Sequence, residues 1–103
     1  MQIVINDAGS SATVVLNGRL DISGADVVAL PLATLSGAKQ SLVIDMAGVT
    51  FVASIGLRHL VMAAKAVGRR GGSLVLINPN AAVVEIITTS GLTDILRIEG
   101  AGD

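Results

Sequence analysis

The serine hydroxyl at position 54 is the group in this sequence best placed to do chemistry. Ser54 follows the apolar run 49–53 and opens a segment of helical spacing that ends at Gly-Arg-Arg-Gly-Gly, residues 68–72. A serine at a helix start commonly accepts a hydrogen bond from a first-turn amide, which is a purely structural role. The same unpaired amides and the helix dipole also favour an anion, so a phosphate on Ser54 would be tolerated. Both interpretations stay open at this point.

A catalytic role for Ser54 is disfavoured by its neighbours. Ala-Ser-Ile-Gly is not the Gly-x-Ser-x-Gly turn of hydrolases, and a serine nucleophile needs a base. The one histidine, His59, lies five residues further along and off the face of Ser54, which favours a surface or boundary position. There are no cysteines, and the aspartates lack metal-site spacing. We therefore predict no catalytic residue, no metal and no cofactor.

Other residues have a place near Ser54 by sequence position. Asp45 lies near the end of a predicted strand and Asp21 follows another, so both are candidates to neighbour the serine. Gly56 is expected to leave the backbone uncrowded for a phosphate. The basic residues of the helix favour a solvated face, and next to Ser54 they would also suit an acidic partner. These basic residues are Arg58, Lys65, Arg69 and Arg70.

Hydrophobic periodicity predicts eight elements in the order β β α β α β α β. The predicted strands are 2–5, 12–16, 41–46, 73–77 and 95–98, followed by a tail at 99–103. The predicted helices are 24–37, a second from Ser54 to the Gly-Arg-Arg-Gly-Gly stop at 68–72, and a third over 81–92 that ends at Ser-Gly-Leu. Residues 6–11 read as a hairpin turn, and residues 17–21 as a break after the second strand. Pro31 predicts a kink in the first helix, or two short pieces, and Asp21 or Ser23 is its expected cap. A helical crossover implies that strands 41–46 and 73–77 pair in parallel.

Length and composition narrow the class of protein. The 103 residues are enough for a single domain, 1–103, with one core. The net charge of −1 disfavours nucleic acid as a direct partner. No apolar run approaches the roughly 20 residues of a membrane helix, and no secretory signal is visible. We therefore expect a cytoplasmic protein with no membrane partner.

Three motifs in sequence order resemble the STAS domain, and within it the bacterial anti-sigma factor antagonists. They are Leu-Asn-Gly-Arg-Leu-Asp at 16–21, Gly-Val-Thr-Phe-Val-Ala-Ser-Ile-Gly-Leu at 48–57, and the Gly-Gly, Asn-Pro and Ser-Gly-Leu positions within 71–92. The resemblance covers nearly the whole chain. It implies an α/β, STAS-like fold with a mixed four- to five-stranded sheet and helices mostly on one face.

The resemblance also implies a partner-switching function. In such systems the unphosphorylated antagonist binds an anti-sigma factor, which is a serine kinase of the histidine-kinase-like ATPase type, and sigma factor is released. The kinase then phosphorylates the antagonist on serine and the complex breaks. A serine phosphatase restores the hydroxyl. The alternative is a non-phosphorylated STAS scaffold or an accessory subunit of a multi-protein complex, such as a lipid-transport complex.

The residues that form the switch in the family are matched to the corresponding positions of this chain. Where the family usually has Asp-Ser-Ser-Gly-Leu or Asp-Ser-Thr-Gly-Leu, this chain has Ala53, Ser54, Ile55, Gly56 and Leu57. The resemblance thus implies phosphorylation at Ser54, without the preceding carboxylate and without the second hydroxyl. It implies partner binding at this segment and at the aspartate after the second strand. The expected partner-binding residues are Asp21, Ala53, Ile55, Gly56 and Arg58.

Overall fold

The structure is a computed structural model that describes residues 1–100, with five strands and three helices in the predicted order. The elements are β1 (Gln2–Ala8), β2 (Ser11–Leu20), α1 (Ile22–Ser36), β3 (Ser41–Val52), α2 (Ser54–Arg69), β4 (Ser73–Ile77), α3 (Ala81–Thr89) and β5 (Arg97–Glu99). The predicted tail begins inside β5, and its residues 101–103 lie outside the described part of the chain. No helix within residues 1–100 is both long enough and apolar enough to cross a membrane.

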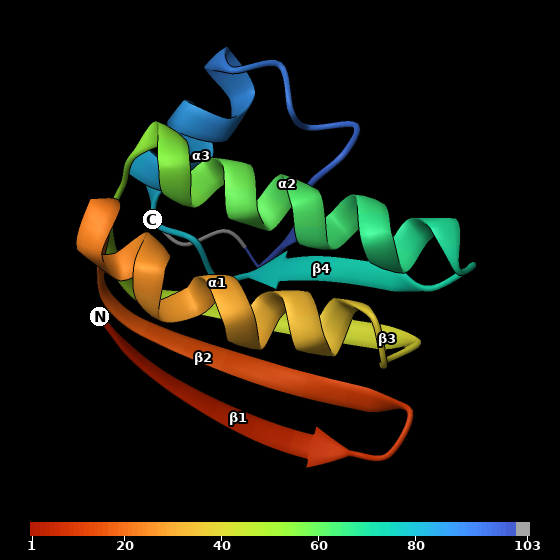
Figure 1. Ribbon diagram of the computed structural model, residues 1–103. Coiled ribbons are helices and arrows are strands. Elements are labelled where there is room, and N and C mark those ends of the chain that lie inside the picture. The colour runs from red at the N-terminus through yellow and green to blue at the C-terminus, as the bar shows by residue number, and fades with distance from the viewer. Residues whose placement is uncertain (101–103) are drawn as a thin grey trace.

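The five strands form one mixed sheet in the order β1-β2-β3-β4-β5 (Figure 1). β1 and β2 pair as an antiparallel hairpin, and the turn between them uses Gly9 at φ +75°. The pairs β2–β3, β3–β4 and β4–β5 are parallel, as helical crossovers require. The mixed sheet and the parallel pairing of the third and fourth strands are therefore confirmed.

One face of the sheet carries the core, and the helices cover that face (Figure 1). Along the central strands every second side chain is buried, because successive side chains point to opposite faces. All three helices contribute buried side chains to the same apolar cluster. The strand residues of this core are Ala12, Val14, Leu16, Leu20, Leu42, Ile44, Met46, Val49, Val52, Leu74 and Leu76. This arrangement confirms the expected one-sided packing of the helices.

β2 and β3 run further than the sequence suggests. The predicted break at 17–21 is wrong, because the strand continues to Leu20 after register shifts next to Asn17 and Gly18. β3 likewise continues to Val52. Gly18 has φ +116°, a value that glycine adopts readily, and a bulge lets the ladder resume with the pair Leu20 and Val52. The extension carries both strands to the edge where Asp21 and Ser54 lie.

The helix ends follow the capping residues. α1 is a single helix through Pro31, so the alternative of two short pieces is wrong. Asp21 is its N-cap and Gly37 its C-cap. α2 ends at Arg69 with Arg70 as its C-cap, and Gly71 follows with φ +77°, which confirms the glycine-rich stop.

Candidate functional site

The candidate site lies at the edge of the sheet formed by the carboxyl ends of β2, β3 and β4. Leu20 and Val52 are register partners, so the residues that follow them, Asp21 and Ala53, start their helices side by side. The amide N–H of Ala53 donates to the Leu20 carbonyl at 2.9 Å. After β4, Asn80 caps α3, and its Nδ2 donates a hydrogen bond to the Val49 carbonyl of β3 at 3.1 Å. This last link between α3 and the end of β3 has no signal in the sequence beyond Asn-Pro-Asn.

Ser54 is the first residue of α2 and is exposed. It is not the cap: that position is held by Ala53, whose extended backbone (φ −89°, ψ 166°) accepts the Leu57 N–H at 3.0 Å. The interpretation of Ser54 as a capping residue is therefore wrong by one position. Because Ala53 has no side-chain acceptor, no side chain caps the first-turn amides of α2. An exposed hydroxyl thus stands at a helix N-terminus that attracts anions.

Gly56 is buried, and its role differs from the one expected. A Cβ at this position would lie 2.5 Å from Cγ of Leu20 and 2.7 Å from the Leu20 carbonyl oxygen. The glycine is needed so that the first turn of α2 can pack against the end of β2, and it does not open space for a phosphate. Gly56 therefore supports the site from beneath and presents no side chain to a partner.

Asp21 is held at the start of α1. Its Oδ1 accepts the Gly24 N–H at 2.9 Å, and its Oδ2 lies 3.5 Å from Nε of Arg19. These contacts, the Gly24 hydrogen bond first, lower the pKa of the Asp21 carboxyl below its usual value. The Arg19 guanidinium in turn stacks 4.5 Å from the centroid of the Phe51 ring. Asp21 is thus a cap beside the site, with part of its side chain still accessible.

Asp45 does not lie at the end of its strand, so the expectation that it neighbours Ser54 is wrong. It pairs with Val15 and Ile77 in the interior of β3. Its Oδ1 accepts the Ala47 N–H at 3.0 Å, just before the register shift in that strand. The carboxylate therefore supports the bulge.

A shallow hollow of about 350 Å³ begins at Ser54 and runs beside α2. Arg58, one turn after Ser54, is exposed on its rim, and Met62 and Leu92 are among its apolar lining residues. Ile55 next to the serine is 36% exposed. Sequence reasoning missed Met62 and Leu92. The Ser-Gly-Leu motif marked Leu92 only as part of a helix end.

The described residues hold no cluster of side chains suited to bind a metal ion. Within residues 1–100 no group of three or more His, Asp or Glu side chains comes together. His59 is half-buried and lines a different groove, between α1 and α2. The site therefore consists of an exposed hydroxyl, a helix N-terminus, the two cations Arg58 and Lys65, and apolar surface.

A family model described as "Mlab, STAS domain" matches residues 3–98. This chain belongs to the STAS domain family. A comparison with curated proteins finds no match. The motifs at 16–21, 48–57 and 71–92 that resemble STAS domains fall within the matched range.

Solved STAS structures share the fold over nearly the whole chain. The unphosphorylated form of SpoIIAA, described as an anti-sigma factor antagonist, has a TM-score of 0.81 at 18% identity, over 95% of this chain and 88% of the other. Phosphorylated SpoIIAA from Bacillus has a TM-score of 0.76 at 17% identity, over 95% and 91%. An anti-sigma factor antagonist from Mycobacterium paratuberculosis has a TM-score of 0.82 at 21% identity, over 94% and 83%. At these identities the likeness is one of fold.

Proposed function

We propose that this STAS domain is a non-enzymatic, cytoplasmic anti-sigma factor antagonist that is switched by phosphorylation at Ser54. Its partner is an anti-sigma factor that is also a serine kinase of the histidine-kinase-like ATPase type, and a serine phosphatase reverses the modification. The observation that carries the proposal is the exposed Ser54 at an uncapped helix N-terminus, beside an apolar hollow rimmed by Arg58. SpoIIAA, whose structures are described in unphosphorylated and phosphorylated forms, has the same fold.

The chemical step is phosphoryl transfer from ATP held by the kinase. Ser54 Oγ attacks the γ-phosphorus, the bond from that phosphorus to the β–γ bridging oxygen breaks, and ADP leaves. The hydroxyl proton passes to a base of the kinase. In the reverse step, water attacks the phosphorus, inorganic phosphate leaves and Ser54 regains a proton. This chain supplies only the acceptor.

The local structure accommodates a phosphate without unfolding. The group would add close to two negative charges at the N-terminus of α2, where the helix dipole and the uncapped amides stabilise an anion. Arg58 lies four residues on, which places it on the same face one turn away. A partner that uses Arg58 and the adjacent apolar hollow would therefore meet a neutralised arginine and a new repulsive charge.

The direct test uses the purified chain with ATP and a histidine-kinase-like ATPase from the same organism. We expect the mass of one phosphoryl group to be added to the wild type and to Ser23→Ala, but not to Ser54→Ala. Ser23 is the matched control, because it is also an exposed serine in the first turn of a helix at this edge. Labelling of Ser54→Ala would contradict the proposal.

The binding half of the switch is tested with Ser54→Asp. We expect the affinity for the same ATPase to fall by at least about ten-fold, because a carboxylate at this point repels an acidic surface and pairs with Arg58. The thermal midpoint should be preserved, since the side chain is exposed at the positive end of a helix. Unchanged affinity would instead support the second candidate.

The second candidate is a constitutive scaffold or accessory subunit. The observation that favours it is that Ala53 and Ile55 stand where related switches carry a carboxylate and a second hydroxyl. In this case the same apolar edge would bind a partner permanently. The absence of labelling at Ser54 together with unchanged affinity of Ser54→Asp would establish it.

A further inference from the structure

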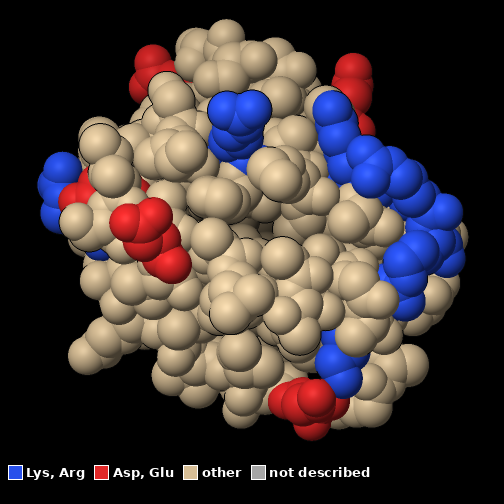
Figure 2. Space-filling model, in the orientation of Figure 1, with Lys and Arg blue, Asp and Glu red and all other residues tan. Residues whose placement is uncertain are grey.

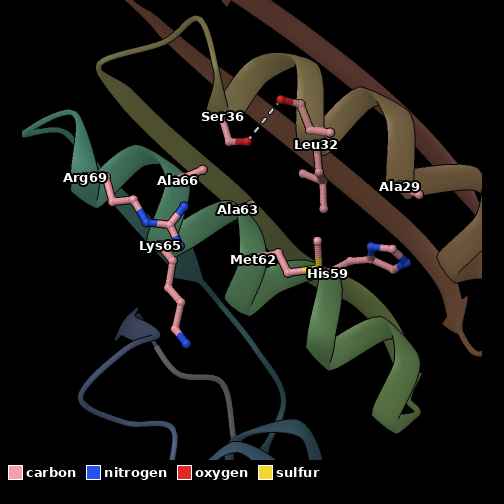
Figure 3. Close-up of a pocket in the computed structure, with 10 residues that line it drawn as sticks. Ala29, Leu32, Ser36, His59, Met62, Ala63, Lys65, Ala66 and Arg69 are labelled. Carbon is pink, nitrogen blue, oxygen red and sulfur yellow. Dashed lines mark hydrogen bonds between the residues drawn. The ribbon is translucent and has the colours of Figure 1, made fainter.

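A second and larger hollow lies between α1 and α2, on the side of α2 away from Leu92. It encloses about 590 Å³. Leu32 of α1 and Ala63 of α2, both buried, are among its lining residues. Alanines from both helices, Ala29 and Ala33 on α1 and Ala66 on α2, line it as well (Figure 3). Small side chains facing one another therefore leave a groove where larger ones would have closed the helix pair.

The surface next to this groove exposes large apolar side chains on both helices. α1 carries one charged residue, Asp26, in its whole length. Leu30 is 75% exposed and Val27 41%, while Met62 on the facing helix is 56% exposed. A helix that is apolar on every side is usually covered on more than one of them. The uncharged expanse over the two helices is visible in Figure 2.

Cations stand on the α2 side of the groove and no carboxylate lines it. Lys65 and Arg69 are lining residues of the groove, and both are exposed. Neither forms an ion pair with any residue in the range 1–100. α2 contains no acidic residue at all. Figure 2 shows the basic side chains gathered along one rim of this face.

We propose that the α1–α2 groove is a docking site for an acidic amphipathic helix of a partner protein. The apolar side of that helix would enter the hollow between the alanines. Its carboxylates would pair first with Arg69 at the edge formed by α2. Lys65 lies on the same helix, with its ammonium group directed away from α1 (Figure 3). Charge complementarity selects this occupant, since within residues 1–100 the groove offers unpaired cations on its α2 edge and only uncharged side chains on its α1 edge.

A second copy of this chain fits the groove less well. The exposed rows of α1 and α2 carry Asp26 as their one acidic residue, against Arg58, Lys65 and Arg69. Two copies meeting through this face would therefore bring unmatched cations together, and like charges across an interface cost affinity. Self-association is thus an outcome that the experiment must distinguish from docking of an acidic helix.

The groove shares Met62 and Lys65 with the hollow at Ser54, but its far end at Arg69 is remote from the serine. The serine lines the other hollow, and Arg69 lies fifteen residues further along the same helix. At 1.5 Å per residue this is about 22 Å, more than twice the Debye length at physiological salt. The charge at Ser54 should therefore leave binding in the groove unchanged, and failure of either proposal leaves the other standing.

The test is a display selection with a random library of helical peptides of about 16 residues, a helix of about 24 Å. The full chain serves as bait, and Ala33→Leu/Ala66→Leu, which fills the groove, serves as the counter-bait. Recovered peptides are synthesised and titrated by fluorescence anisotropy against Arg69→Glu, Arg97→Glu and Ser54→Asp. Arg97 is the matched control, because its reversal changes the net charge equally but it lies on β5, outside the groove. Sedimentation of each variant reports self-association and thermal unfolding reports folding.

The expected peptides are rich in Asp and Glu, with apolar residues spaced by three and four. They should bind the wild type, Arg97→Glu and Ser54→Asp equally, and Arg69→Glu at least about ten-fold more weakly. If the filled-groove variant fails to fold, the Arg69→Glu comparison still decides. Recovery of no peptide, recovery of basic or neutral peptides, or equal binding to Arg69→Glu would each overturn the proposal. Wild-type dimerisation that the filled groove abolishes would overturn it in favour of a second copy.

Discussion

Ala53 occupies a position at which most helices carry a side-chain acceptor. Its backbone has the extended conformation of an N-cap, so a polar residue there would reach the first-turn amides without rearrangement. We expect Ala53→Asp to raise the free energy of unfolding by about 1 kcal/mol, measured by urea denaturation. Ala53→Asn is the control that supplies the acceptor without the charge. A variant no more stable than the wild type would show that the cap geometry is not usable.

Gly56 is constrained by packing against the end of β2. The Cβ of an alanine would meet Leu20 at 2.5 Å, and a backbone oxygen is among the atoms in the way. We expect Gly56→Ala to cost about 1–3 kcal/mol in unfolding free energy, as overpacking does. Gly68 in the same helix is the matched control, since nothing lies within 4 Å of its added Cβ. Gly68→Ala should be neutral or stabilising by up to about 1 kcal/mol, and equal costs at both positions would refute the packing argument.

At the scale of the elements, the start of α1 gives the fold a dependence on pH. The Gly24 amide lowers the pKa of Asp21, and Lys39 with the Gly9 amide lowers that of Asp7. A lowered pKa means that the ionised carboxylate stabilises the fold above its ordinary pKa of about 4. This contribution is lost as the pH falls through the lower folded value.

We therefore expect the thermal midpoint of the wild type to fall on acidification below about pH 4, and that of Asp21→Asn to fall less steeply. Asparagine keeps the capping acceptor but does not titrate, so the two proteins should show parallel pH dependence above about pH 6. Asp21→Ala removes the capping acceptor at every pH, so its thermal midpoint shows how much stability the cap contributes. Identical slopes for wild type and Asp21→Asn below pH 4 would rule out this coupling.

The order of the elements was predictable because each has a strong local period. The strand 73–77 was predicted to the residue, and the end of α2 was predicted within the Gly-Arg-Arg-Gly-Gly segment, since a short apolar run and a glycine stop are local signals. The position of Ser54 at the junction of strand and helix was also predictable. Its exposure was not, because exposure depends on where α3 and the segment after it pass.

Features that depend on contacts between strands escaped prediction. The sequence 17–21 looks like a break, yet parallel pairing with β3 carries the strand through it to Leu20. Asp45 likewise looks like the end of a strand in the sequence, yet β3 continues past it to Val52. From the sequence, Gly56 was expected to leave the backbone uncrowded. Its actual role, to let α2 pack closely against Leu20, depends on a contact between distant parts of the chain. Each error arose where tertiary packing overrode a local signal.

For the molecule as a whole, the two ends of the helical layer have different tasks. Ser54 and Asp21 lie at the carboxyl edge of the parallel strands, and the turn after α2 lies at the other. There Arg70 Nη1 donates to the carbonyls of Ser36 at 2.9 Å and Lys39 at 2.8 Å. Lys39 in turn pairs with Asp7 in β1. This network ties α1, α2 and the β1–β2 hairpin together far from the hydroxyl.

We expect Arg70→Ala to lower the free energy of unfolding by about 1–2 kcal/mol, because two hydrogen bonds from a charged donor are lost. Arg69→Ala is the neighbouring control and should stay within about 0.5 kcal/mol, since Arg69 makes no ion pair within residues 1–100. Neither variant should change the rate of phosphoryl transfer to Ser54, because α2 separates the two ends by about 24 Å. Urea denaturation and the labelling assay measure the two effects separately. A slower transfer to folded Arg70→Ala would mean that the far end of the molecule controls the site.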